Sequence, residues 1–171
     1  MKLDLGAGKR KEAGFIGVDK IAFEGVDVVC DLGKDHWPFE DSTVDEAQAI
    51  QFVEHLTPPE RIHFANELWR VLKPGGKCLI VTPHWCSPRA YGDLTHVWPP
   101  VSEWWYPYLN SDWRKDNAPH NVEYKCNFSF APGGYSIRED LKIRNADYQQ
   151  YALLNFKGAA EDLAQTITAI K

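Results

Sequence analysis

A short glycine-containing segment near the N-terminus constrains the fold of this chain more than any other feature. Residues Lys2 to Leu5 have the apolar character of a short buried strand, and Gly6-Ala7-Gly8 follows as a turn. A second apolar stretch, Phe15 to Val18, ends on Asp19. Glycines let the backbone approach a ligand closely, and an acid at the end of the next strand can accept hydrogen bonds from ribose hydroxyls. This pattern predicts an α/β protein with a nucleoside site.

The details of the turn argue against two common nucleotide sites. A dinucleotide fingerprint needs a third glycine, where this chain has Lys11, and places its acid about 20 residues further on. Asp19 lies only 13 positions after Gly6, and no lysine followed by Ser or Thr comes after the turn, as a P-loop requires. Asp4 would repel a pyrophosphate but attract a positively charged group. S-adenosylmethionine (SAM) carries both an ammonium and a sulfonium.

The length and composition indicate one domain over residues 1–171. The hydrophobic content of 44% and the charged content of 25% are ordinary for a globular protein. No apolar run reaches the ~18 residues of a membrane helix, and we expect no signal peptide before the first strand. The four cysteines have no paired spacing, as is usual where thiols stay reduced. We therefore expect a cytoplasmic protein that does not bind membranes. The net charge of −5 argues against nucleic acid as a partner.

The N-terminal half alternates strands with turns and one strong helix. Thr57-Pro58-Pro59-Glu60 combines a capping residue, a proline in the first turn and a glutamate three residues after the cap. Apolar residues then fall on one face at helical spacing, namely Ile62, Ala65, Leu68, Trp69 and Leu72. Strands are expected at 3–5, 15–18, 26–30, 46–50 and 78–81, the last of them covered on both faces. The order predicts a doubly wound, Rossmann-like, mostly parallel sheet.

The second half differs in composition. Residues 84–120 hold five of the seven tryptophans and five prolines, which predicts an irregular insertion after the fifth strand with one or two short helices. Pro132-Gly133-Gly134 between two apolar stretches predicts a β-hairpin of 122–130 with 135–141. Residues 145–157 are expected to be helical. The β-branched residues of 163–170 favour an antiparallel C-terminal edge strand, with continuation of the helix as the alternative.

In this order the motifs resemble those of class I SAM-dependent methyltransferases, and in particular the small type 11 group. The resemblance runs from Leu3 to about His84, roughly half of the chain. It is carried by six segments: Leu3 to Gly8, Phe15 to Asp19, Cys30 to Leu32, Trp37 to Asp45, Val53 to Leu56, and Leu68 to Gly76.

The resemblance implies SAM as cofactor, S-adenosylhomocysteine as product, and a role for each matching residue. At the amino-acid end of SAM, Gly6 and Gly8 would let the backbone approach, and Asp4 would attract the ammonium. At the other end, Asp19 would hold the ribose, and Asp31 and Leu32 would bind adenine. Gln51 would lie near the methyl group. For the three aspartates, capping of a local turn is the alternative. The usual helix before the first strand has no counterpart here, and only six residues separate Gly8 from Phe15, so we expect a more exposed SAM unless the insertion or a partner subunit covers it.

The resemblance also implies a methyl transfer to an oxygen or nitrogen of a small molecule or glycan, with a non-catalytic SAM-binding sensor or partner subunit as the alternative. The candidate catalytic residues are His96, in Asp93-Leu94-Thr95-His96, and His84 at the end of the fifth strand; for His96 the alternative is a hydrogen bond that ties the insertion to the sheet. His84, Cys86 and His96 fit no common zinc spacing, so no metal is expected. The aromatic insertion is an acceptor pocket, a self-packing core or a homodimer contact.

Overall fold

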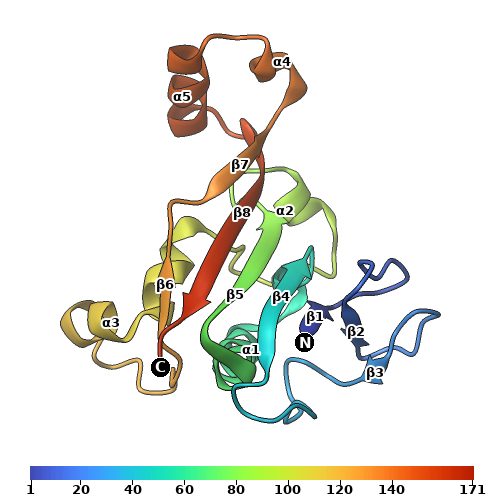
Figure 1. Cartoon of the computed structure of the whole chain (residues 1–171). Helices are drawn as coiled ribbons and strands as arrows, with labels where there is room; N and C mark the ends of the chain where they lie inside the picture. The colour runs from blue at the N-terminus through green and yellow to red at the C-terminus, as the bar shows by residue number, and fades with distance from the viewer.

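The computed structural model describes residues 1–171 and places eight strands in one sheet (Figure 1). The strand order is β3-β2-β1-β4-β5-β8-β6, with β7 also paired to β8. Five strands are parallel: β1 (Lys2–Leu5), β2 (Ile16–Asp19), β3 (Val28–Val29), β4 (Val44–Ile50) and β5 (Leu72–Pro83). The order reverses between β1 and β4, where open α/β sheets bind ligands at the carboxyl ends of their strands. The predicted Rossmann-like fold class is confirmed.

The crossover between β4 and β5 is the predicted helix, α1 (Pro58–Val71), which follows a short turn of helix, η1 (Val53–His55). The capping prediction is confirmed, since the Thr57 backbone N–H donates to the Glu60 carboxylate at 2.8 Å. The buried face is partly different from the predicted one: Ala65 and Leu68 are buried as expected, whereas Phe64 and Val71 are buried in addition. The core-facing stripe is therefore rotated toward Phe64, which packs against Trp37.

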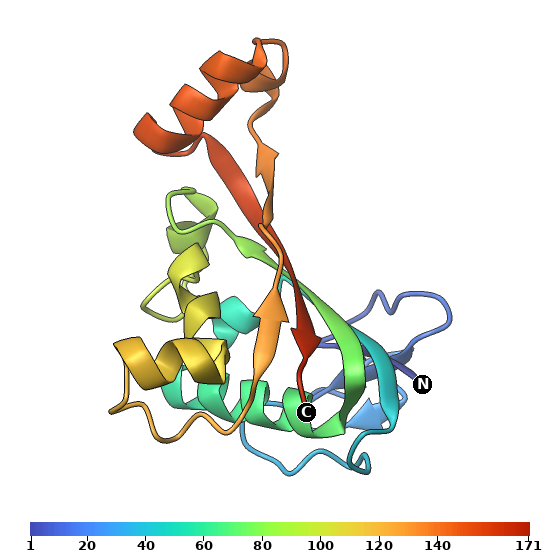
Figure 2. The ribbon, with the colours of Figure 1, turned by 60° about the vertical axis from the view of Figure 1, so that its left-hand side comes forward.

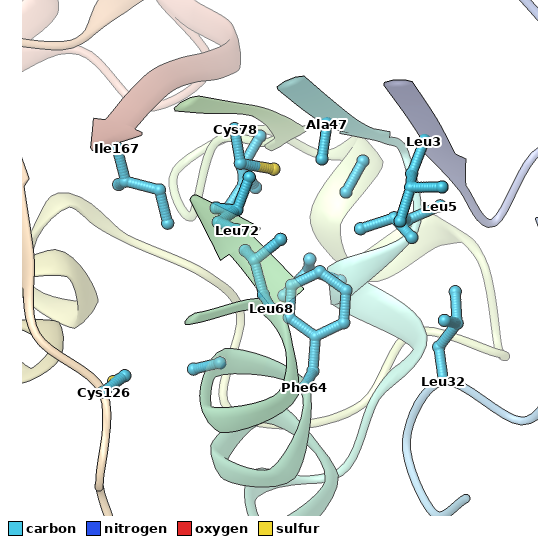
Figure 3. Packing of buried hydrophobic residues seen from close by; sticks show 14 of the residues in the cluster. Leu3, Leu5, Leu32, Ala47, Phe64, Leu68, Leu72, Cys78, Cys126 and Ile167 are labelled. Carbon is cyan, nitrogen blue, oxygen red and sulfur yellow. The ribbon is translucent and has the colours of Figure 1, made fainter. Parts of the chain in front are cut away.

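One hydrophobic core lies between α1 and the sheet (Figure 3). Leu3 and Leu5 of β1, Ala47 of β4 and Cys78 of β5 meet the helix residues Phe64 and Leu68. All of these side chains have less than 2% of their surface exposed. Because the strands pack on α1 through this core, the core determines where their carboxyl ends and the loops that follow them lie relative to the helix.

Helices cover only one face of the sheet. In Figure 2 the green, yellow and gold helices α1, α2 (Arg89–Gly92), η2 (Glu103–Leu109) and α3 (Ser111–Asn117) all lie on the same side. The expectation that 78–81 is covered on both faces is wrong, because Leu79 is 37% exposed while Cys78 and Ile80 are buried. The reason is the short β1–β2 connection, which contains turns and no helix. The six residues between Gly8 and Phe15 thus form no helix.

The C-terminal edge is antiparallel, as predicted, and 163–170 lies in a strand, β8 (Ala160–Ala169). The predicted hairpin is wrong: β6 (Phe128–Phe130) and β7 (Gly134–Ile137) do not pair with each other. Both pair with the same edge of β8, one after the other. In the gap between them, the Gln165 side-chain amide donates to the Ala131 carbonyl at 2.5 Å. The ten-residue strand β8 thus pairs along this edge with two short strands instead of one long strand.

The remaining helices complete the chain. Residues 84–120 form the predicted irregular insertion with short helices, and its Trp105 packs against the main core. At the far end of β7 and β8 lie α4 (Glu139–Lys142) and α5 (Ala146–Asn155), close to the predicted 145–157, around a small cluster that contains Leu141 and Ala152 (Figure 1). None of the helices combines the length and the apolar composition needed to span a bilayer.

Candidate active site

The glycine turn after β1 packs tightly against the segment after β4. The backbone N–H groups of Gly6 and Ala7 both donate to the Val18 carbonyl, at 2.8 and 3.2 Å. Gly6 has φ of +77°, and a Cβ there would lie 2.3 Å from the ring of Phe52. A side chain at this position would therefore be strained and would also overlap the ring. The glycine allows Phe52 to lie against the bare backbone of the turn.

Asp4 is buried and holds the loop that follows the turn. Its carboxylate accepts hydrogen bonds from the Glu12 backbone N–H at 2.8 Å and from the Gln48 side-chain amide at 3.1 Å. Both oxygens are thus engaged within the protein, and Asp4 does not line the cavity described next. This arrangement supports the turn-capping alternative for Asp4 over direct contact with a ligand.

A cavity of about 410 Å³ lies at the carboxyl ends of β1, β2 and β4. Such a volume is within the usual range of small-ligand sites. The structure brings five of the seven predicted cofactor residues together in its wall: Gly6, Asp19, Asp31, Leu32 and Gln51. Asp4 and Gly8 do not line it. Gly8 contacts the wall from behind one of these residues, since its N–H donates to Asp19 at 3.0 Å.

The two predicted acids of this wall, Asp19 and Asp31, are already oriented by the backbone. Asp19 accepts from the N–H groups of Gly8 and Ile21, at 3.0 and 2.9 Å. Asp31 accepts from the N–H of Gly33 at 3.1 Å. Each carboxylate keeps lone pairs beyond these bonds, because an ionised carboxyl group offers about four acceptor positions. Hydrogen bonds from a ribose and from an adenine amino group can be added without breaking either turn.

A second cavity, of about 750 Å³, adjoins the first. The two share Gln51 and His55, and the second is also lined by Glu54, Arg89 and His96 together with Pro83, Gly92, Asp93 and Leu94. Gln51 has a left-handed backbone, with φ of +54°, and its side-chain amide donates to Asp162 at 3.0 Å. One guanidinium nitrogen of Arg89 donates to both carboxylate oxygens of the same Asp162, at 2.8 and 2.9 Å. The boundary between the cavities is therefore held by a fixed polar network.

Glu54, His55 and His96 form a cluster in the wall of the second cavity. One ligand atom from each lies within 4.8 Å of the others. The rings of His55 and His96 meet edge to face, with centroids 4.8 Å apart. Burial raises the pKa of Glu54 to about 7 and lowers that of His55. Sequence reasoning missed Glu54, although an acid next to a histidine a few residues after a strand was a usable signal.

His84, the other predicted catalytic residue, lines neither of these cavities. Its Nε2 donates to Glu103 at 2.7 Å, and its Nδ1 faces the Cys86 sulfur at 2.9 Å. His84, Cys86 and His96, whose spacing fits no common zinc site, do not form one cluster, because His96 lies with Glu54 and His55. His84 borders a third cavity of about 790 Å³, lined by aromatic residues that include Trp85, Trp98 and Trp104.

Comparison with known proteins agrees with this fold. The family described as a methyltransferase domain matches residues 3–80. A SAM-dependent methyltransferase from Archaeoglobus fulgidus is 18% identical, with a TM-score of 0.67 over 98% of this chain and 85% of that one. A chain from the complex between the Haloferax volcanii Trm112 methyltransferase activator and a methyltransferase is also 18% identical to this chain. Its TM-score is 0.62 over 99% of this chain and 82% of that one.

A third similar structure holds ligands. It is the 1,6-didemethyltoxoflavin-N1-methyltransferase of Burkholderia thailandensis with bound 1,6-didemethyltoxoflavin and S-adenosylhomocysteine. It is 13% identical, with a TM-score of 0.59 over 99% of this chain and 71% of that one. Identities this low show a shared fold, while the family match covers the glycine turn and the strand ends that line the first cavity. Residues 3–80 of this chain therefore match the methyltransferase-domain family, and the chain as a whole shares the fold of SAM-dependent methyltransferases.

Proposed function

We propose that the chain transfers a methyl group from SAM to an oxygen or nitrogen atom of a small hydroxylated molecule or a glycan. The observation that carries this proposal is the contact between the two cavities at Gln51 and His55. Methyl transfer is an in-line displacement, so the acceptor atom must lie next to the sulfonium methyl group. A cofactor in the first cavity and an acceptor in the second would satisfy this condition.

In the first cavity, the proposed placement of SAM follows the strand ends. Asp19 would accept from the ribose hydroxyls and Asp31 from the adenine amino group, with Leu32 against the ring. The Gly6 backbone would approach the amino-acid part, while Asp4 and Gly8 would act through the shape of the turn. Lys20 and Lys34 also lie in this wall, where a cation would offset the charge of the carboxylates.

The lining of the second cavity supports a polar acceptor. It contains both signs of charge, from Arg89 and from Glu54 and Asp93, and Leu94 is its main apolar side chain. Such a surface suits hydroxyl groups that donate and accept hydrogen bonds. His96 would contact the acceptor there. His84 lies outside this cavity and would act only indirectly, through its hydrogen bond to Glu103. The small heteroaromatic acceptor of the Burkholderia enzyme is consistent with a small acceptor here.

Calorimetric titration of SAM and S-adenosylhomocysteine tests the cofactor half of this proposal. We expect micromolar binding by the wild type and a loss of at least about tenfold in Asp19→Ala, since a hydrogen-bonded carboxylate contributes about 1.5–3 kcal/mol. Asp112→Ala, an exposed aspartate outside both cavities, is the matched control. Equal binding by Asp19→Ala and the control would contradict the placement.

Release of S-adenosylhomocysteine in the presence of a panel of hydroxylated and amine acceptors tests the acceptor half. Turnover that His96→Ala abolishes while SAM binding stays intact is the expected result. SAM binding without turnover on any acceptor or cell extract would favour the alternative of a non-catalytic SAM-binding protein.

A further inference from the structure

We propose that Glu54, His55 and His96 form a binding site for a divalent transition-metal ion in the wall of the acceptor cavity. Two imidazoles and one carboxylate are a donor set that suits Zn²⁺, Fe²⁺ or Co²⁺ better than Mg²⁺ or Ca²⁺, which prefer oxygen ligands. The site departs from the sequence-based expectation of no metal, because its histidines are 41 positions apart in the chain and only the fold brings them together.

The first argument is the state of the Glu54 side chain. The residue is 4% exposed, and neither of its carboxylate oxygens has a hydrogen-bond partner. The nearby buried cation does not pair with it: Arg61 donates to the backbone carbonyls of Val53, Val97 and Pro99. A buried carboxylate without a partner is costly. A bound cation would supply the partner that the protein itself does not provide.

The second argument is the orientation of the histidines. His55 Nδ1 lies 3.0 Å from the Thr95 hydroxyl, which in turn donates to Asp93 at 2.7 Å. The hydroxyl therefore accepts from His55, whose proton is on Nδ1. His96 Nδ1 lies 3.4 Å from the Ala90 carbonyl, which can only accept. In both rings Nε2 is left with its lone pair, as in metal sites where the other ring nitrogen donates to a second group.

The third argument is geometric. The Val97 backbone N–H donates to the Glu54 carbonyl at 2.9 Å, which fixes the segment of His96 against η1. Ligand atoms arranged tetrahedrally around one ion with bonds of about 2.0–2.2 Å lie about 3.3–3.6 Å apart. The ligand atoms of the cluster lie within 4.8 Å of one another, so they would have to approach by up to about 1.5 Å to bind one ion. Asp93 lies 3.9 Å from His96 Nε2 and faces the same cavity.

The role of the ion rests on the proposed function, but its binding does not. A metal ion lowers the pKa of a hydroxyl group that it binds. An acceptor alcohol held there would release its proton to solvent, and its oxygen would form the new bond to the methyl carbon. The carbon–sulfur bond would break with its electron pair left on sulfur, giving S-adenosylhomocysteine. The ion would thus hold and activate the acceptor at the boundary of the two cavities.

The test is titration of the chelator-treated full-length protein with Zn²⁺ and with Co²⁺, by calorimetry and by Co²⁺ absorption, with no SAM present. We expect one ion per chain and a loss of more than about 100-fold in affinity in Glu54→Gln and His96→Gln. Thr95→Val removes the hydroxyl that accepts from His55 Nδ1 but leaves the Thr95 carbonyl, 3.3 Å from the same nitrogen, so binding should weaken by about tenfold, the lower end of the usual effect of such partners. This variant and His96→Gln keep the test decisive if Glu54→Gln does not fold.

Two controls separate this site from other donors. His120→Gln removes an exposed histidine, and Cys86→Ser removes the partner of His84; both should bind the ions as the wild type does. Absence of saturable binding, unchanged binding in Glu54→Gln and His96→Gln, or loss of binding in Cys86→Ser would overturn the proposal. Because SAM binding is measured separately, failure of the metal site leaves the cofactor titration unaffected, and the reverse also holds.

Discussion

Gly6 lies where the glycine turn, the first cavity and Phe52 meet. A Gly6→Ala substitution would place a methyl group 2.3 Å from the Phe52 ring, at φ of +77°. The left-handed backbone alone costs about 1–2 kcal/mol for a residue with a side chain. The matched control is Gly14→Ala, because Gly14 has φ of +82° and open space around it. We expect Gly6→Ala to lower the free energy of unfolding more than the control, measured by urea denaturation. Equal losses would mean that Phe52 moves aside freely.

The His84–Glu103 pair makes a prediction about acid stability. Burial opposes ionisation of Glu103, but hydrogen bonds from His84, the backbone and Tyr135 outweigh it and lower its pKa to about 2 from the ordinary 4.5. A carboxylate with a lowered pKa stabilises the fold above its ordinary pKa, and this effect is lost as the pH falls from about 4.5 toward 2. Glu103→Gln should therefore reduce the free energy of unfolding at pH 7, with the difference from wild type shrinking in that acid window. The exposed Glu123→Gln should show neither effect.

At the scale of elements, agreement between sequence and structure depends on how local the signals are. The four residues Thr57 to Glu60 contain the whole signal for the start of α1, and the apolar residues of Leu3 to Leu5 predict a strand by themselves. Pro132-Gly133-Gly134 is an equally strong local signal for a turn, yet it lies between two strands that pair with β8. The competing partner is about 30 residues away and has a free edge long enough for both. Pairing with a distant strand of this kind leaves no mark in the local pattern.

Gln165 bridges the gap that results, and this gives a prediction for the edge of the sheet. It is buried, and its amide donates to the Ala131 and Thr166 carbonyls. Gln165→Ala would leave the Ala131 carbonyl without this partner, which we expect to cost about 1–3 kcal/mol of stability. Thr166→Ala, an exposed neighbour in the same strand, should change stability by less than about 0.5 kcal/mol. Urea denaturation measures both, and equal effects would contradict the bridging role.

At the scale of the whole molecule, the two cavities differ in how far the sequence predicts them. The first is built from the ends of consecutive strands, and the resemblance to class I methyltransferases assigns Asp19, Asp31 and Gln51 to it by their places after those strands. The second forms where the insertion folds back on η1, and it depends on the Val97–Glu54 backbone bond. That contact spans more than 40 residues and follows from packing. Sequence reasoning therefore placed His96 in the site but not its neighbour Glu54.

The aromatic insertion makes the last prediction, which concerns assembly. Trp98 and Trp104 are 74% and 72% exposed and border the third cavity together with Trp85. Exposed tryptophans that cluster in this way are typical of interface anchors, and we propose that they join two copies of this chain. Sedimentation should then show a concentration-dependent dimer for the wild type and a monomer for the double variant Trp98→Ser/Trp104→Ser. Val29→Ser, which removes a 60% exposed side chain in β3, should leave the dimer intact. A wild type that stays monomeric at all concentrations, or a dimer that survives loss of both tryptophans, would exclude this interface and leave the insertion as an acceptor pocket or a self-packing core.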